Sequence, residues 1–420
     1  MRDILLFLIV VGSLPYALMR PHIGLLVWSW LGYMNPHRLT FGFAYSAPFV
    51  AVVAAVTIVA MLFSKEKKTF PWSGITIAWV LFIIWSCFVT YWFAINPSGA
   101  AWELNRMLKI QVMILCTLLL ITTKERLIQL VWVIAMSIGF FGIKGGVFAV
   151  GSGFNYHVKG PAGTFIGGNN ELAMALLMVI PLFYFLFTVT KSKYIKIALI
   201  GFIFLCFFSV VASYSRGAFL GMAMMSVFFW WGMKRKILIA GLVGVVLAVG
   251  LPLLPGQWFE RMSTIETYQE DASANSRFNT WLMAINLAND RPIVGGGFKP
   301  FSAKAYQMYA PNPDLIFDAH SIYFEVLASQ GYVGFIFFMS MLFLVLFKAQ
   351  QIKMRCKKDN GLYWMFTLAN MVQVSFVAYM VAGAFLGMAY FDLPYHLMSI
   401  VVILDVLYRK HQQEKNTNAR

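Results

Sequence analysis

The chain has 420 residues, of which 60% are hydrophobic and only 12% are charged. About a quarter of the residues in soluble domains are charged, so this composition excludes an ordinary soluble domain. The formal net charge of +16 would suggest nucleic-acid binding in a soluble protein. Here most lysines and arginines stand in short clusters between apolar runs, so we expect no nucleic-acid partner and attribute the charge to membrane topology and anionic lipids.

Apolar runs recur along most of the chain, and many are long enough to cross a hydrocarbon core of roughly 30 Å as a helix. We therefore predict an all-α polytopic membrane protein with about twelve transmembrane helices. The predicted spans are one of 1–19 and 21–35, then 45–63, 71–92, 102–122, 127–150, 170–190, 196–215, 217–233, 236–253, 321–347, 362–387 and 391–408. If both of the first two segments crossed, there would be thirteen spans. We expect residues 1–19 to be a retained segment, because no small-residue cleavage site follows them.

Six basic clusters fix the predicted topology: residues 65–68, 124–126, 191–196, 234–236, 348–358 and 409–420. The positive-inside rule places all six in the cytoplasm, and the spans between them then alternate without conflict. This topology divides the chain into N-terminal transmembrane helices (1–253), a large non-cytoplasmic loop (254–319), C-terminal transmembrane helices (320–408) and a cytoplasmic tail (409–420). The loop is where we expect the soluble chemistry.

Two elements are predicted within the large loop. Residues 276–289 have apolar side chains at near-helical spacing, which is typical of an amphipathic helix that lies on the membrane or closes over a cavity. Residues 291–298 contain Gly295, Gly296 and Gly297 in succession, which opposes any helix and predicts a tight turn.

Three residues are the strongest candidates for chemistry. Arg216 lies at the non-cytoplasmic junction between two spans, where the positive-inside rule disfavours arginine and small neighbours leave room for an anion. Arg277 opens the predicted amphipathic helix, where the helix dipole disfavours a cation unless something anionic binds there. His320 joins the large loop to the next span, where an imidazole could act as a general base near neutral pH.

A second group of cations is weaker. Arg261 and Arg291 lie in the large loop, and Arg106, Lys109 and Lys144 lie near the non-cytoplasmic ends of spans, where they could line the same cavity. We expect neither metal nor cofactor, because the sequence has no Asp-x-Asp pair, no HExxH, no paired histidines at helical spacing and no Walker loop. The four cysteines show neither disulfide nor metal-binding spacing.

The motifs around these residues resemble those of the O-antigen ligase and polymerase superfamily of bacterial envelope enzymes. The resemblance covers most of the chain, and the subgroup of exosortase-associated O-glycosylation ligases is similar at the N-terminus. The motifs are Ser215-Arg-Gly-Ala218, Arg277-Phe-Asn-Thr-Trp281, Pro292-Ile-Val-Gly-Gly-Gly297, Ala319-His-Ser-Ile-Tyr-Phe-Glu325 with Gly331 and Gly334, the segment 163–173 with Asn170, and Arg20-Pro21 with residues 33–38.

The resemblance implies a GT-C-like fold in the bacterial inner membrane with its active site facing the periplasm. It implies transfer of a glycan from undecaprenyl pyrophosphate to a sugar hydroxyl of the lipid A core oligosaccharide, with inversion and without metal. In this assignment Arg216 and Arg277 hold the pyrophosphate, His320 is the base, and Asn170 belongs to the substrate site. We expect a monomer that contacts membrane lipids.

Two alternatives use the same donor and residues: an O-antigen polymerase, whose acceptor is another lipid-linked repeat, and a protein O-oligosaccharyltransferase. An alternative of another class is a lipid or glycan transporter, which a twelve-span protein with a basic surface would also fit. The sequence has no half-to-half repeat and no mid-span Asp or Glu pair for ion coupling, so we place the transporter behind the transferases.

Overall fold

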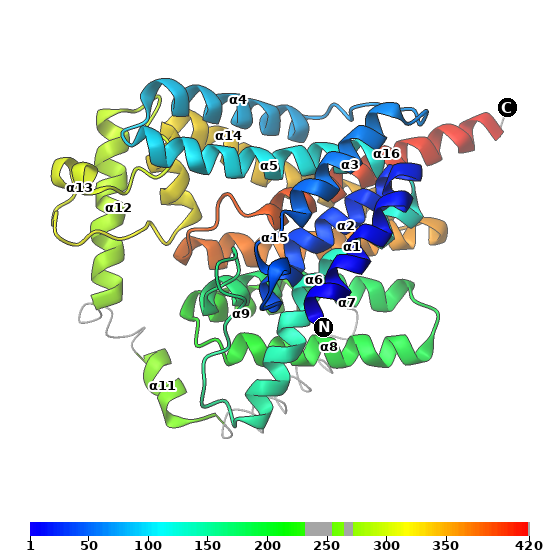
Figure 1. Cartoon of the computed structure of the whole chain (residues 1–420), viewed down its shortest axis with the longest axis horizontal. Coiled ribbons are helices and arrows are strands. Elements are labelled where there is room, and N and C mark those ends of the chain that lie inside the picture. The colour runs from blue at the N-terminus through cyan, green and yellow to red at the C-terminus, as the bar shows by residue number, and fades with distance from the viewer. Residues whose placement is uncertain (232–253, 264–271, 419–420) are drawn as a thin grey trace.

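A computed structural model describes residues 1–231, 254–263 and 272–418 of the protein (Figure 1). These residues form helices joined by loops, and no strand occurs among them. The α-helices are α1 (Arg2–Met19), α2 (Pro21–Met34), α3 (Phe49–Phe63), α4 (Gly74–Phe93), α5 (Pro97–Leu120), α6 (Lys124–Gly151), α7 (Asn169–Val189), α8 (Lys193–Val211), α9 (Arg216–Trp231), α11 (Gly256–Ser263), α12 (Ala272–Asp290), α13 (Ala303–Tyr309), α14 (Ile322–Cys356), α15 (Tyr363–Ala382) and α16 (Asp392–Asn418). The all-α, multi-pass prediction is confirmed in this coarse form.

Among the described residues, seven helices are long and apolar enough to cross a membrane: α1, α4, α6, α7, α8, α14 and the α15 region. Helices α3 and α9 are apolar but shorter, and α5 carries the charged residues Glu103, Arg106 and Lys109. The predicted span 236–253 lies outside the described residues. Twelve spans therefore stay a prediction.

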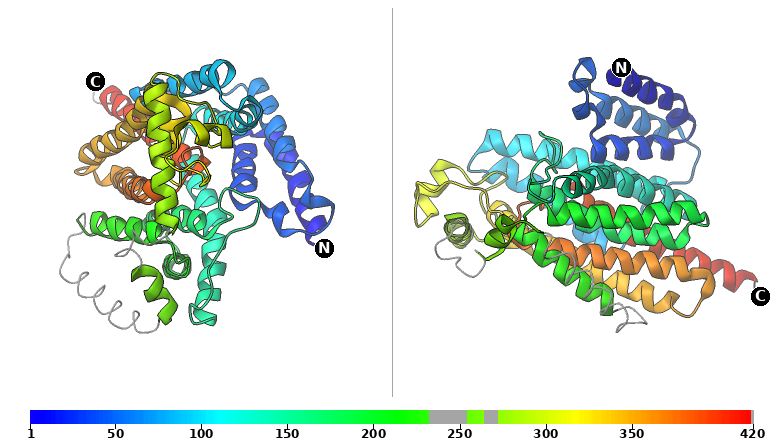
Figure 2. Two further views of the ribbon diagram at one scale, coloured as in Figure 1. Left: turned by 90° about the vertical axis from the view of Figure 1, so that its left-hand side faces the viewer. Right: turned by 90° about the horizontal axis from the view of Figure 1, so that it is seen from below.

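The core of the bundle is α7, whose side chains from Leu172 to Phe183 are all buried. Helices α6, α8, α9 and α15 pack around it, and α1, α2 and α3 form a separate group at one side (Figure 2). Close packing with α8 depends on the glycines of α6, because a Cβ at Gly146 would overlap the backbone of Leu205. Small residues of this kind let membrane helices approach closely.

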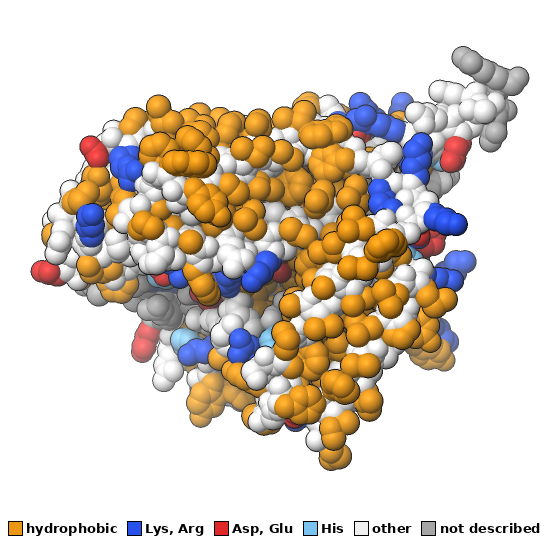
Figure 3. All heavy atoms as spheres, turned by 45° about the horizontal axis from the view of Figure 1, so that its top comes forward, with side chains coloured by type: hydrophobic (Ala, Val, Ile, Leu, Met, Phe, Trp, Pro, Cys, Tyr) orange, Lys and Arg blue, Asp and Glu red, His pale blue; other side chains and the backbone are white. Residues whose placement is uncertain are grey.

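Most of the basic clusters lie at one end of the bundle. Arg126 at the start of α6 donates to Glu66 in the α3–α4 loop at 2.7 Å, and Asp405 of α16 pairs with Arg409 at 2.6 Å and with Lys348 of α14 at 3.8 Å. The space-filling view shows many lysines and arginines at this end and hydrophobic side chains along the bundle (Figure 3). Helices α12 and α13 lie at the opposite end (Figure 1). The predicted sidedness stays a prediction.

Two helices continue beyond the predicted ends of their membrane spans. Helix α14 continues to Cys356, past the predicted span end at 347, and α16 continues through the predicted tail to Asn418. Both extensions are rich in lysine, arginine and glutamine, which are good helix formers. A helix can leave the apolar region without ending, because the pattern that marks the membrane is apolarity and not helicity.

The predicted amphipathic helix at 276–289 is confirmed as α12, which begins earlier than predicted. Its buried face is formed by Met283, Ala284 and Leu287, which are fully buried. Phe278 and Leu282, two further apolar residues of this helix, are 43% and 48% exposed. The spacing of apolar side chains therefore predicts the helix and does not say which of these residues meets a neighbouring helix.

The predicted glycine turn is confirmed, and it closes a break in α14. Gly331 has φ 64° and ψ −172°, which interrupts the helical hydrogen bonds. The amides of Gly296 and Gly297 donate to α14 carbonyls before the break at 2.8 and 2.9 Å, and Tyr332 after the break donates to the carbonyl of Pro292 at 2.8 Å. The turn thus supplies partners to backbone groups that could not remain unpaired in an apolar environment.

Replacing Gly331 with alanine should destabilise the protein. Positive φ costs an L-residue about 1–3 kcal/mol, and the new Cβ would lie 2.5 Å from the carbonyl oxygen of Ile293. We expect a thermal unfolding midpoint several degrees lower in detergent. The control is Gly201→Ala in α8, where a Cβ meets nothing within 4 Å and alanine favours the helix. Equal midpoints for both variants would show that the break at Gly331 is not under this constraint.

Candidate functional site

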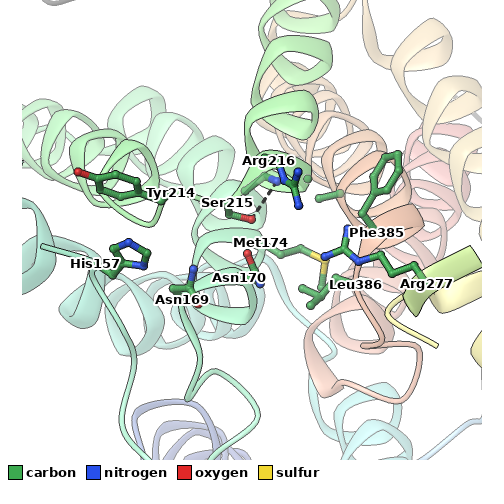
Figure 4. Close-up of a pocket in the computed structure, with 13 residues that line it drawn as sticks. His157, Asn169, Asn170, Met174, Tyr214, Ser215, Arg216, Arg277, Phe385 and Leu386 are labelled. Carbon is green, nitrogen blue, oxygen red and sulfur yellow. Dashed lines mark hydrogen bonds between the residues drawn. The ribbon is translucent and has the colours of Figure 1, made fainter. Parts of the chain in front are cut away.

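The structure brings Arg216, Arg277 and Asn170 together around one cavity of about 200 Å³. Arg216 comes from the start of α9, Asn170 from the start of α7 and Arg277 from α12, while Phe385 and Leu386 close the side toward α16. The two guanidinium groups reach into the cavity from different helices, with Asn170 below them in Figure 4. Three segments that are far apart in the sequence therefore share one small polar space.

A tight turn before α9 positions Arg216. Tyr214 has φ 56°, in the left-handed region, and the Ser215 hydroxyl accepts the amide of Ala218 at 3.2 Å, which is the pattern of a helix N-cap. The side-chain amide of Asn169 donates to the carbonyl of Ser213 at 2.7 Å and so ties α7 to this turn. The N-termini of α7 and α9 thus both border the cavity, where their helix dipoles favour an anion.

Arg277 lies in the second turn of α12, because this helix begins at Ala272. The sequence prediction placed it at a helix start, and the argument from an unfavourable helix dipole therefore does not hold. Arg277 is assigned to the candidate site because it lines the same cavity as Arg216. A pair of planar guanidinium groups is suited to bidentate binding of phosphate oxygens.

Helix α12 also holds the segment that leads to His320. The indole nitrogen of Trp281 donates to the carbonyl of Ala319 at 2.7 Å, and the Trp281 ring stacks on Phe324 with 4.9 Å between centroids. Asn279 exchanges hydrogen bonds with the backbone of Asn312 at 2.8 and 2.9 Å. Helix α12, which contains Arg277, therefore fixes the backbone of the segment that precedes His320.

His320 is half-buried and lies beside the cavity rather than among the residues that line it. A Cβ added at Gly387, next to the cavity wall at Leu386, would be 3.6 Å from the backbone nitrogen of His320. His320 has φ 43°, a conformation that non-glycine residues seldom adopt and that recurs at functional sites.

Burial lowers the pKa of His320, and the positive charge of Arg277 lowers it further, against the opposing effects of Asp318 and Glu171. The imidazole is therefore neutral at pH 7, the form that accepts a proton. The free energy of unfolding therefore depends on the protonation of His320. The stability is fully present above the pKa of His320 in the unfolded chain, about 6.5. It is lost as the pH falls below that value, because the unfolded chain then binds the proton more readily than the folded protein.

The remaining predicted residues lie elsewhere. Arg106 lines a second cavity and Lys144 lines a third, so the expectation that these cations share the cavity of Arg216 was wrong. Arg291 donates to the carbonyl of Phe93 at 2.6 Å and joins the end of α12 to the end of α4. Arg261 is in α11, but its side chain lies outside the described residues.

Two residues that the sequence analysis did not select belong to the cavity. His157 stacks on Tyr214 with 4.4 Å between ring centroids, and both line the cavity with Arg216 (Figure 4). The Tyr214 hydroxyl donates to the carbonyl of Phe154 at 2.7 Å, which fixes the loop between α6 and α7. The only signal in the sequence was that His157 lies in a polar loop, and a loop residue's partner across the fold leaves no local pattern.

No group of three or more His, Cys, Asp or Glu side chains with the arrangement of a metal site occurs in the part of the chain that the structure describes. Anionic groups in the cavity would meet the two guanidinium groups and the helix N-termini.

Replacing Arg277 with glutamine should raise the pKa of His320 toward its ordinary value, because a neighbouring positive charge is removed. The measurement is an NMR titration of histidine-labelled protein in micelles, with His320→Gln assigning the signal. Arg291→Gln is the matched control, since Arg291 binds the carbonyl of Phe93 and does not contribute to the pKa of His320. An unchanged midpoint in Arg277→Gln would mean that the two side chains are not coupled.

Comparison with known proteins gives two family matches. Residues 201–339 match the family described as O-Antigen ligase, and this region includes Arg216, Arg277 and His320. Residues 1–193 match a family of unknown function (DUF5935), which covers α1 to α7. No curated protein matches the chain. This multi-pass membrane protein therefore carries an O-antigen ligase domain at residues 201–339, which supports a relationship to the O-antigen ligase and polymerase superfamily.

Proposed function

We propose that the protein is an O-antigen ligase that transfers a glycan from undecaprenyl pyrophosphate to a sugar hydroxyl of the lipid A core at the periplasmic face of the inner membrane. The observation that carries the proposal is the pair Arg216 and Arg277, which face one cavity beside a neutral histidine. The O-antigen ligase domain supports the same class of reaction.

The two arginines have the chemistry that a pyrophosphate leaving group requires. Negative charge grows on the bridging oxygen as the glycosidic bond breaks, and fixed guanidinium groups stabilise that charge without reorganising. The N-termini of α7 and α9 add backbone amides on the same side. This arrangement lets cationic side chains do the work that a metal ion does in other phosphate-leaving reactions.

The transfer step needs one base. The acceptor hydroxyl attacks the anomeric carbon, the carbon–oxygen bond to the pyrophosphate breaks, and undecaprenyl pyrophosphate leaves with the electron pair. His320 takes the hydroxyl proton, for which its lowered pKa keeps the imidazole neutral. A single displacement from the opposite face inverts the configuration and needs no carboxylate nucleophile.

His320→Ala at normal expression should lower transfer by about 10²–10⁴-fold, the range typical of a lost general base. The readout is capped lipopolysaccharide on a gel, with protein abundance measured beside it. Arg216→Lys keeps the charge but loses the planar fork, so it should also reduce capping. Arg20→Gln, at an exposed arginine between α1 and α2, is the control. Persistent capping in His320→Ala would refute the base assignment and would favour a transporter.

A direct assay of transfer identifies the acceptor. Purified protein is incubated with undecaprenyl-pyrophosphate-linked glycan and with lipid A core, further lipid-linked repeat or a protein acceptor in separate reactions. We expect product with lipid A core. Product only with lipid-linked repeat would identify a polymerase, and product only with the protein would identify an O-oligosaccharyltransferase.

A further inference from the structure

A second cavity of about 280 Å³ shares two walls with the first. The segment 163–170, which comprises the end of the loop before α7 and the start of that helix, contributes Thr164 and Phe165 to the second cavity and Asn170 to the first. The segment that leads into α16 contributes Phe391 to the second cavity and Leu386 to the first. The same two segments therefore contribute to both cavities, and the proposed function uses only the first.

Two cations of α5 line the second cavity. The Arg106 guanidinium lies 3.5 Å from the ring centroid of Phe165 and 3.7 Å from the carboxylate of Glu103. Lys109 lies almost one turn further along α5, is exposed, and has no ion pair among the described residues. Cations are costly near the membrane unless they meet an anion or water. This part of the cavity is suited to a phosphate or carboxylate.

Asp392 gives the cavity an acceptor that lacks a donor. Its side chain lines the cavity, the residue is 6% exposed, and its Oδ1 atom has no hydrogen-bond partner in the described part of the chain. A buried carboxylate oxygen without a donor is unfavourable, and such atoms often mark a place where a ligand binds. A sugar hydroxyl is a donor of the right kind.

The remaining wall is aromatic and fixed. Trp28, Tyr33, Phe165 and Phe391 line it, and rings of this kind can cover the apolar face of a sugar. The hydroxyl of Tyr33 is hydrogen-bonded to the imidazole of His396 at 2.5 Å, deep in the bundle. Cations, a carboxylate and aromatic rings thus occur together in one space.

We propose that the second cavity binds the acceptor, a sugar that carries a phosphate or carboxylate group. Arg106 and Lys109 bind the anionic group, and Asp392 accepts a hydroxyl of the sugar. The assignment rests on the proposed function and places the acceptor across the shared wall from the donor. His320 lies beside Gly387, and Gly387 belongs to the segment that contributes Leu386 to the first cavity and Phe391 to the second. A base at this position can reach the acceptor hydroxyl.

Cysteine protection tests this assignment without measuring transfer. Thr164→Cys reports on the second cavity and His157→Cys on the first, after the half-buried Cys87 is replaced by serine. A maleimide labels the purified full-length protein in nanodiscs with rough lipopolysaccharide, the same material after phosphatase treatment, or phosphatidylglycerol. We expect rough lipopolysaccharide to slow labelling of Thr164→Cys and not of His157→Cys, and phosphatase treatment to weaken the effect.

Adding Arg106→Gln should weaken the protection of Thr164→Cys about tenfold or more, because a hydrogen bond between charged groups is lost. Adding Arg20→Gln should leave it unchanged. Protection of His157→Cys instead of Thr164→Cys, equal protection by phosphatidylglycerol, or none by any probe would each overturn the assignment. Transfer activity is assayed, with added lipid-linked donor, on the Cys87→Ser protein that has no substitution in either cavity: transfer without protection refutes only the cavity assignment, whereas protection without transfer refutes the ligase and leaves a binding site.

Discussion

The break in α14 at Gly331 is the constraint on which the site depends. The turn 292–297 fills the gap with three backbone hydrogen bonds, and Gly295 lies so close that a Cβ there would be 2.5 Å from the amide of Gly331. The turn is the C-terminal continuation of α12, so one end of α12 is fixed to the middle of α14. The bond from Trp281 to the carbonyl of Ala319 fixes α12 a second time, at the approach to α14. Arg277 and His320 are therefore held by the same two attachments.

The electrostatics of the site follow from this attachment. A single cation, Arg277, lines the cavity that we assign to the anionic donor and also lowers the pKa of His320. One charge can thus favour both the leaving group and the neutral base, which are the two requirements of the proposed transfer. An anion bound at Arg277 would partly offset this effect and make the imidazole a stronger base when the donor is present.

Charged side chains have different surroundings at the two ends of the bundle. Around Asp405, cations of α14 and α16 gather on a buried carboxylate and join the two helices. At the other end, Arg216 and Arg106 border cavities. Charges at the first end serve packing, and charges at the second end are placed where a ligand can enter. The two cavities there share walls and still have different chemistry, two guanidinium groups in one and a carboxylate among cations and rings in the other.

The sequence by itself determined the membrane class, the all-helical fold and the turn at the three glycines, and it singled out Arg216, Arg277 and His320 as candidates. These follow from apolarity, residue order and backbone preference, which are local properties. Only the tertiary structure decided that Arg216, Arg277 and Asn170 share a cavity, that Arg106 and Lys144 do not, that α12 buries Met283 in place of Phe278, and that His157 and Tyr214 belong to the site. The physical reason is that membrane helices associate by shape and backbone pairing across long separations, as at Gly146 and Gly331, and no local pattern records which helix the partner comes from.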